Sequence, residues 1–192
     1  MPYGKQDINE DDINSVNEVL KSDFLTQGNV HKEFEDAISR TVSSRYCVSF
    51  NSATSALHIA CLALGLGEGD ILWTTPTTFV ASANCAIYCG AKVDFVDIDS
   101  KTGLMSIELL EEKLYEASKI GKLPKIIVPV HLAGSSCDMP SIFNLSKKFG
   151  FHIIEDASHA IGGLCNTFKV GSCRYSDITV FSLHPVCLLY TS

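Results

Sequence analysis

From Tyr46 onward, the chain alternates short apolar runs with longer segments of helical periodicity, and this alternation constrains the fold more than any other feature. The apolar runs are unbroken, as expected for strands whose two faces are both covered. Segments of about 10–15 residues separate most of them, which is long enough for a crossover helix between parallel strands. The sequence therefore predicts an α/β fold, with a mostly parallel sheet and helices on both faces. The predicted strands are 46–50, 71–75, 93–98, 125–130, 152–155 and 178–181, and the predicted helices between them are 55–64, 79–88, 107–118 and 139–149.

Two amphipathic helices are predicted ahead of the first strand. Helices that precede every strand favour an arm that lies across another surface, and simple packing against the parent domain is an equally open alternative. The expected organisation is a helical arm over 1–43, followed by a larger domain over 44–186. The first helix covers 10–21 with Ile13, Val16, Val19 and Leu20 on one stripe, and the second carries Val30, Phe34, Ala37 and Ile38.

Composition and charge narrow the class of protein. A chain of 192 residues, of which 46% are hydrophobic, can bury a core of its own. A formal net charge of −7, with no block of Lys or Arg, disfavours a nucleic-acid partner. No apolar run approaches the ~20 residues that cross a bilayer, and the N-terminus lacks the apolar segment of a signal peptide, so a cytoplasmic protein without a membrane partner is expected. The eight cysteines include no C-x-x-C pair, which argues against both a metal and a disulfide framework.

Small polar clusters stand at the ends of the predicted strands. In a parallel sheet, ligands gather in the crevice at the carboxyl ends of the strands. Hydroxyl, carboxyl, imidazole and aromatic groups would meet there, and together they indicate a site for a phosphorylated pyridine cofactor. The clusters are Asn51–Thr54, Thr75–Phe79, His131, Asp156–His159 and Ser182–His184.

The segment 51–55 leaves one strand and opens a helix. Backbone N–H groups and hydroxyls at a helix N-terminus form an anion site that suits phosphate. Helix capping by Ser52 or Thr54 is the alternative interpretation. Ser182 offers a further hydroxyl after the last strand, where an ordinary polar residue at a strand exit is the alternative.

Asp156 directly follows a buried run, so its carboxylate is expected to be partly desolvated and to need a compensating cation. A protonated pyridine nitrogen is one such cation, and a helix cap is the alternative. His159 could donate to a ring oxygen, although a core or surface histidine is the more common case. Phe79 could stack on a flat ring, and core packing is its alternative.

Six stretches between Tyr3 and about Val186 carry a resemblance to a known family. They are Asn51–His58, Thr78–Asn84, Phe95–Asp99, Pro129–Gly134, Glu155–His159 and Asp177–Ser182. On these stretches the chain resembles the DegT/DnrJ/StrS sugar aminotransferases, which have the fold-type-I architecture and use pyridoxal 5′-phosphate. The sequences of Val130-His131 and of Phe181–Val186 are similar to those of a branch of that family from pseudaminic acid synthesis.

The resemblance implies a role for each candidate side chain. Phe79 would stack on the pyridine ring, Asp156 would pair with the ring nitrogen, and His159 would sit near the phenolic ring oxygen as the catalytic contact. Asp156 would keep that nitrogen protonated and so preserve the electron sink of the cofactor. The residues that would hold the cofactor phosphate are Ala53, Thr54 and Ser182.

The same resemblance implies an activity and partners. The reaction would be transfer of an amino group from glutamate to a 4-keto nucleotide sugar, UDP-linked and of the pseudaminic-acid type. The family completes its active site across a homodimer interface, so the leading helices would dock on a partner subunit. The chain would then be an N-terminal fragment of the full enzyme.

The position of the Schiff-base lysine departs from the family pattern. In the family, this lysine directly follows Phe-Ser-x-His-Pro-Val, and here Cys187 stands in its place. The chain as given is therefore expected to be inactive. Because the match stops abruptly after Val186, residues 187–192 are expected not to be native sequence. Two alternatives stay open: a lysine-less sugar dehydratase relative, in which histidine usually replaces the lysine, and a non-catalytic cofactor-binding or regulatory protein.

Overall fold

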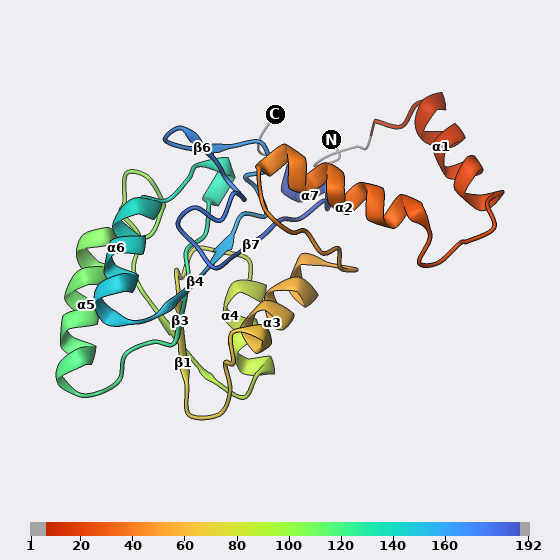
Figure 1. Cartoon of the computed structure of the whole chain (residues 1–192). Coiled ribbons are helices and arrows are strands. Elements are labelled where there is room, and N and C mark those ends of the chain that lie inside the picture. The colour runs from red at the N-terminus through yellow and green to blue at the C-terminus, as the bar shows by residue number, and fades with distance from the viewer. Residues whose placement is uncertain (1–6, 189–192) are drawn as a thin grey trace.

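A five-stranded sheet forms the centre of the computed structural model, which describes residues 7–188 (Figure 1). All neighbouring strands of this sheet are parallel, which confirms the predicted α/β fold. In spatial order the strands are β2 (Lys92–Phe95), β1 (Ile71–Thr74), β3 (Ile126–Val128), β4 (His152–Asp156) and β7 (Ile178–Val180).

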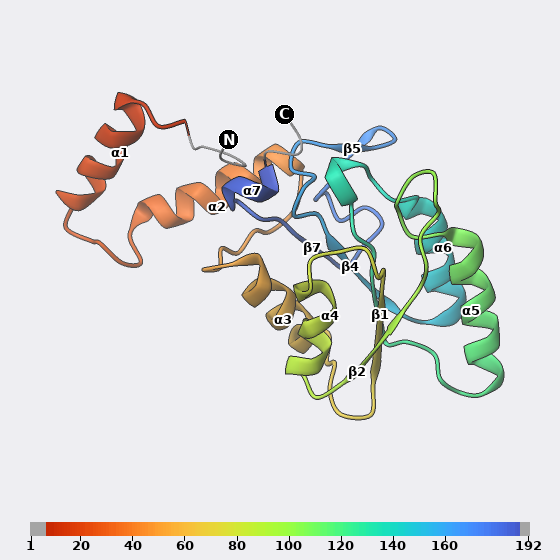
Figure 2. The same cartoon turned by 180° about the vertical axis from the view of Figure 1, so that it is seen from behind.

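Helices cover both faces of the sheet (Figures 1 and 2). On one face lie α3 (Ala53–Ala63) and α4 (Ala81–Tyr88), and on the other lie α5 (Ile107–Lys119) and α6 (Met139–Phe149). Neighbouring residues of a strand point to opposite faces. Ile153 therefore joins the core with α5 and α6, while Ile154 joins the core with α3 and α4. This division fixes which side chains of β4 can face each helix layer.

Local capping explains where these helices begin. The Ser52 hydroxyl accepts from the Ser55 N–H at 3.2 Å and starts α3. Ser106 caps α5 in the same way, and Asp138 caps α6 by accepting from the Ser141 N–H at 3.2 Å. Each cap satisfies an N–H group that has no acceptor within its own helix.

The predicted strand at 46–50 is wrong. Among the described residues this segment forms no strand ladder. It is bonded to a helix instead, because the Ser49 N–H donates to the Glu35 carboxylate at 2.7 Å. An apolar pattern supplies side chains suited to a strand, but tertiary packing decides whether the segment pairs with a neighbouring strand.

Some elements were not predicted. A hairpin joins β5 (Leu164–Cys165) to β6 (Phe168–Lys169), and its turn places Asn166 at φ 55°. A 3₁₀ turn covers Leu132–Gly134, and a short helix, α7, covers Pro185–Leu188. Strands of two residues are too short to show a periodic pattern, so turn geometry and tertiary contacts decide them. Residues 189–192 of the expected non-native segment lie outside the described residues, and the proposed extent of that segment and of the two domains stays a prediction.

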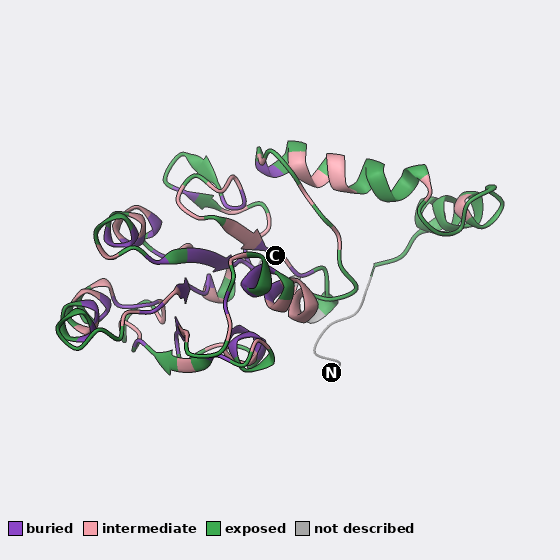
Figure 3. Cartoon of the chain, turned by 60° about the horizontal axis from the view of Figure 1, so that its bottom comes forward, coloured by how far each residue is buried: buried purple, intermediate pink, exposed green. Residues whose placement is uncertain are grey.

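The N-terminal arm consists of α1 (Glu10–Leu20) and α2 (Asn29–Val42). No residue of α1 is buried, and Figure 3 shows this helix projecting from the body of the molecule as an exposed element. The far end of α2 is attached to the body, where Val42 is buried and the Lys169 ammonium donates to the Thr41 carbonyl at 2.6 Å. The apolar stripe of α1 therefore does not pack against the parent domain.

Among residues 7–188, no helix is both long enough and apolar enough to cross a membrane.

Candidate active site

The carboxyl ends of β1, β3, β4 and β7 meet at one edge of the sheet, and α3 begins on the same side of the molecule (Figure 1). The connection that leaves β1 forms α4 on one face, whereas the connection that leaves β3 forms α6 on the other. Strands with connections to opposite faces define the crevice in which α/β sheets bind ligands. The fold thus brings the predicted polar clusters to the expected binding edge.

Asp156 is the last residue of β4 and points toward the layer of α3 and α4. One carboxylate oxygen, Oδ2, accepts from the Ser82 hydroxyl at 2.6 Å. The other, Oδ1, accepts from the Ser158 hydroxyl at 2.7 Å and from the Ser158 N–H at 3.2 Å. The residues directly after Asp156 form a turn and not an α-helix, so the helix-cap interpretation is wrong.

These contacts define what Asp156 can bind. A carboxylate that accepts from three donors acts as an ionised acceptor. Asp156 is only 4% exposed, and it forms no ion pair within the described residues. A buried negative charge without a cation is costly, so the position fits a cationic group such as a protonated pyridine nitrogen.

Ser158 belongs to the predicted cluster Asp156–His159 but had no role assigned, and Ser82 was not predicted as a site residue. Ser158 stands two residues after Asp156, the spacing at which an aspartate bonds its own following backbone, and this local signal was available in the sequence. Ser82 has no comparable local signal, because it lies 74 residues before Asp156 and on a different element.

The Phe79 side chain is 72% exposed, so the core-packing alternative is wrong for this ring. Phe79 was expected to open a helix, but α4 begins at Ala81, and Phe79 lies in the preceding turn. An aromatic ring held on a short turn beside the binding edge is available to stack on a flat ligand.

The start of α3 has the geometry of an anion site. Ser52 is the cap, as the alternative interpretation proposed, and this leaves Ala53 and Thr54 as the first two helical residues. Backbone N–H groups at these positions have no acceptor within the helix, and the helix dipole adds positive potential there. Ala53 also packs against the core cluster that contains Ile154 and Val180, so α3 begins beside the ends of β4 and β7.

Ser182 follows β7 and is 8% exposed. Its hydroxyl oxygen accepts from the His184 N–H at 3.2 Å, which leaves the hydroxyl hydrogen available to donate. A hydroxyl donor near the start of α3 is suited to a phosphate oxygen.

His159 is half-buried, in the turn that follows β4. Its Nδ1 accepts from the Ala133 N–H at 3.3 Å, and Ala133 adopts a left-handed conformation with φ 52°. An accepting Nδ1 places the proton of a neutral ring on Nε2. The 3₁₀ turn after His131 therefore orients the imidazole of His159.

A buried pair supports this turn from the other face of the sheet. Nε2 of His131 lies 2.7 Å from Oε2 of Glu155, and the Cys137 N–H donates to Nδ1 of His131 at 3.2 Å. The other Glu155 oxygen accepts from the Ser176 hydroxyl and from the Thr179 hydroxyl, the latter at 3.0 Å. Burial alone raises the pKa of Glu155, but the hydrogen bonds from His131, Ser176 and Thr179 hold that pKa below its ordinary value.

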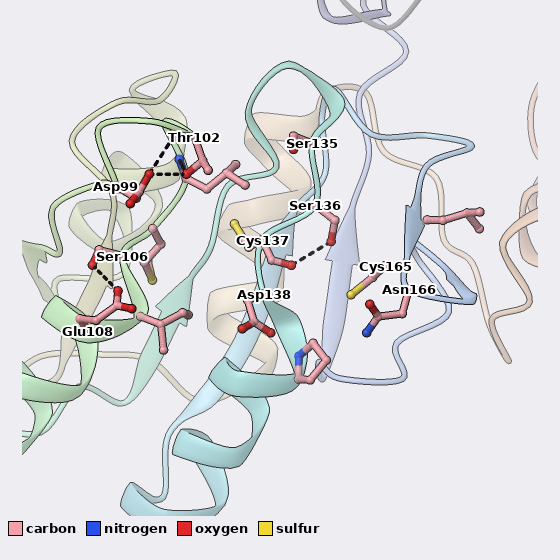
Figure 4. Close-up of a pocket in the computed structure, with 15 residues that line it drawn as sticks. Asp99, Thr102, Ser106, Glu108, Ser135, Ser136, Cys137, Asp138, Cys165 and Asn166 are labelled. Carbon is pink, nitrogen blue, oxygen red and sulfur yellow. Dashed lines mark hydrogen bonds between the residues drawn. The ribbon is translucent and has the colours of Figure 1, made fainter.

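A cavity of about 520 Å³ lies elsewhere, at the starts of α5 and α6 (Figure 4). None of the predicted site residues lines it, and no Lys, Arg or His is among its lining residues. Its carboxylates Asp99, Glu108 and Asp138 each accept a hydrogen bond from a residue two or three positions away in the sequence. The cavity therefore does not suit the phosphates of a nucleotide sugar. The described residues also contain no group of three or more His, Cys, Asp or Glu side chains that could hold a metal ion.

The parallel sheet, with its helices on both faces and its polar carboxyl edge, is the large domain of a fold-type-I aminotransferase. A family model described as the DegT/DnrJ/EryC1/StrS aminotransferase family matches residues 6–192, and the chain belongs to this family.

Two curated relatives illustrate what the chain is similar to within the family. It is 41% identical over 186 residues to the UDP-4-amino-4,6-dideoxy-N-acetyl-β-L-altrosamine transaminase of Campylobacter jejuni, covering 97% of this chain and 48% of that protein. It is 34% identical over 186 residues to the UDP-4-amino-4-deoxy-L-arabinose–oxoglutarate aminotransferase of Shewanella sediminis, covering 97% of this chain and 46% of that protein.

Solved structures of aminotransferases also match the chain. PseC of Helicobacter pylori, an aminotransferase involved in the biosynthesis of pseudoaminic acid, matches with a TM-score of 0.86 at 33% identity, over 95% of this chain and 47% of its own. Spr1654 of Streptococcus pneumoniae in its PLP form matches with a TM-score of 0.85 at 31% identity, over 97% of this chain and 49% of its own. The chain spans about half the length of these relatives.

Proposed function

We propose that this chain is the cofactor-binding half of a pyridoxal-phosphate-dependent aminotransferase that aminates a nucleotide sugar at a keto carbon. The observation that carries the proposal is the buried carboxylate of Asp156, which accepts three hydrogen bonds and forms no ion pair within the described residues. Membership of an aminotransferase family supports the class of reaction.

Each site residue has a task that its surroundings support. The Asp156 carboxylate binds a protonated ring nitrogen, while the exposed ring of Phe79 covers one face of the pyridine. The first turn of α3, with Thr54, and the Ser182 hydroxyl bind the phosphate. His159 donates from Nε2 to the phenolic oxygen. When bound, pyridoxal phosphate supplies the electron sink for amino transfer.

Proton transfer at the reacting carbon needs a positioned base, and Cys187 stands at the position that a lysine occupies in the family. Loss of such a base costs on the order of 10²–10⁴-fold in rate. We therefore propose that the chain itself holds the cofactor without a covalent link. This substitution is also the observation that favours the second candidate function, a non-catalytic cofactor-binding protein.

The finer proposal is a 4-keto UDP-sugar of the pseudaminic-acid type as substrate, with glutamate as amino donor. It is supported by the names of the Campylobacter jejuni and Helicobacter pylori relatives. The test uses a protein that carries this chain together with the second half present in the relatives. Its rates of amination of 4-keto and 3-keto UDP-sugars are compared. Preference for the 3-keto sugar would contradict the proposed substrate.

Cofactor binding can be tested on the 192-residue chain directly, because Trp73 is its only tryptophan and lies buried in β1. Pyridoxamine 5′-phosphate is the suitable probe, since its amine does not react with lysines. We expect saturable quenching of Trp73 emission by this probe and much weaker quenching by pyridoxamine without the phosphate. Equal quenching by both compounds would contradict the proposed phosphate site.

Replacing Cys187 with lysine is expected to restore a covalent link to the cofactor. Incubation of the Cys187→Lys variant with pyridoxal phosphate, followed by borohydride, should give a stable adduct at position 187 by peptide mass mapping. Pyridoxamine phosphate should prevent it. Cys173→Lys, at another half-buried cysteine, is the matched control. Equal labelling of the two introduced lysines would show non-specific chemistry and remove position 187 from the site.

The arm is proposed to pack on a second copy of the protein. The stripe of Ile13, Val16 and Leu20 is 45%, 59% and 62% exposed, and apolar surface of this kind commonly marks an interface. In a protein that includes the second half, light scattering is expected to report a dimer, and Val16→Asp to weaken it. Ser15→Asp adds the same charge beside the stripe and should leave the dimer intact. A monomer at every working concentration would exclude this arrangement.

A further inference from the structure

A chain of hydrogen bonds links the start of α4 to the end of β4. We propose that Ser82 is a positioning residue that fixes the Asp156 carboxylate and the Phe79 turn relative to each other. The inference rests on the proposed cofactor site, and it adds to that site a residue on which the placement of both cofactor contacts depends.

The direction of the hydrogen bonds follows from their lengths. The Ser82 hydroxyl is fully buried, and its oxygen lies 2.6 Å from Oδ2 of Asp156 and 3.2 Å from the Phe79 carbonyl. A hydroxyl has one hydrogen, and the ionised carboxylate at the shorter distance is the stronger acceptor. Because the Ser82 hydrogen is thereby committed to Asp156, the Thr78 hydroxyl, whose oxygen is 2.8 Å away, donates to Ser82.

Ser82 ties the side chain of Asp156 to another element. The Ser158 donors belong to the turn directly after β4, so they move together with Asp156. Ser82 instead approaches from α4, the helix that follows the Phe79 turn. Its hydroxyl therefore sets the rotation of the carboxylate, and with it the direction of the oxygens toward the ring nitrogen.

The same residue holds the aromatic contact. The Ser82 N–H donates to the Phe79 carbonyl at 3.2 Å, which closes the turn on which Phe79 stands. A flat ligand stacked on Phe79 and bonded through its nitrogen to Asp156 needs both contacts at a fixed separation. One buried serine, bonded to both residues, provides that separation.

The test compares Ser82→Ala, Ser82→Thr and Ser82→Cys in the 192-residue chain. Ser146→Ala is the matched control, because Ser146 is also buried and donates to a helix carbonyl, that of Phe143, at 2.8 Å in α6. Two quantities are measured for pyridoxamine phosphate labelled with ¹⁵N in its ring: the dissociation constant, and the pH at which the bound ring nitrogen loses its proton, from its ¹⁵N chemical shift.

Ser82→Ala is expected to weaken binding about tenfold, the size of one lost hydrogen bond to a charged group. The deprotonation midpoint of the bound ring should move toward that of the free compound. Threonine, which keeps the hydroxyl, should restore both quantities, and cysteine, a weaker donor, should give intermediate values. If the role of Ser82 were purely structural, its replacement would lower stability without moving the midpoint, as expected for Ser146→Ala.

The outcomes separate this inference from the proposed function. If the unmodified chain does not bind pyridoxamine phosphate, the cofactor site itself is wrong. If the unmodified chain binds and Ser82→Ala leaves both quantities within the range of Ser146→Ala, the cofactor site stands and the role of Ser82 is overturned. Should Ser82→Ala fail to fold, Ser82→Cys decides, because unchanged binding and midpoint in that variant overturn the inference as well.

Discussion

Replacing Glu155 with alanine is expected to lower the free energy of unfolding by about 3–5 kcal/mol, because each buried donor left without its acceptor costs roughly 1–3 kcal/mol. The substitution leaves the donors from His131, Ser176 and Thr179 without their acceptor inside the protein. For a domain of this size, the loss corresponds to a fall of about 6–20 °C in the unfolding temperature. Urea and thermal unfolding followed by Trp73 emission would measure it.

A control variant distinguishes loss of the His131–Glu155 contact from a general effect of removing a carboxylate. Glu116→Ala removes an exposed carboxylate that pairs with Lys119, and it should cost well under about 1 kcal/mol. A double-mutant cycle with His131→Ala should show that the two residues are coupled rather than independent. A loss below about 1 kcal/mol for Glu155→Ala would mean that the buried network does not stabilise the fold.

The same carboxylate should give the stability a defined pH dependence. The pKa of Glu155 is lower in the folded state than the ordinary value of about 4.3. As the pH falls, the unfolded state takes up the proton first, so the contribution of Glu155 is complete above about pH 4.3 and is lost as the pH falls through the folded pKa. In Glu155→Gln this acid-side slope should be reduced, while Glu116→Gln should keep it. His131 contacts the same carboxylate and has to be titrated alongside it.

Replacing Asp156 with asparagine is expected to weaken pyridoxamine phosphate binding by about 10- to 150-fold. This range corresponds to the ~1.5–3 kcal/mol of a hydrogen bond to a charged group. Asparagine keeps the shape of the side chain and still accepts from one serine, but it removes the charge that holds a protonated ring nitrogen. Quenching of Trp73 emission measures the affinity, and the ¹⁵N shift of the ring nitrogen reports its protonation.

Asp138→Asn is the matched control for this prediction. Asp138 caps α6, on the other layer of helices, and asparagine is an equally good cap, so stability and binding should both be close to those of the unmodified chain. The Asp156→Asn variant should also remain folded, because removal of a buried charge without an ion pair relieves a desolvation cost. Unchanged binding in Asp156→Asn would remove Asp156 from the cofactor site.

The sequence determined the layered architecture through short-range periodicity. The apolar runs around Ile127 and Ile153 and the helix 139–149 could be assigned because strand and helix periods are local properties of the chain. The parallel order of these strands then placed Asp156, His159 and Ser182 at one edge, since carboxyl ends of parallel strands share an edge. The class of site followed from this convergence, while the roles of its residues stay predictions.

Only the tertiary structure decided the surroundings of each group. It showed that 46–50 does not join the sheet, that Phe79 is exposed, and that Ser82 donates to Asp156. Such facts depend on contacts between segments far apart in the chain, which no local pattern encodes. Ser82 and Asp156 are separated by 74 residues, and their hydrogen bond exists because α4 and β4 pack in the same core. Local periodicity specifies which faces are apolar, and packing of those faces specifies which polar groups meet.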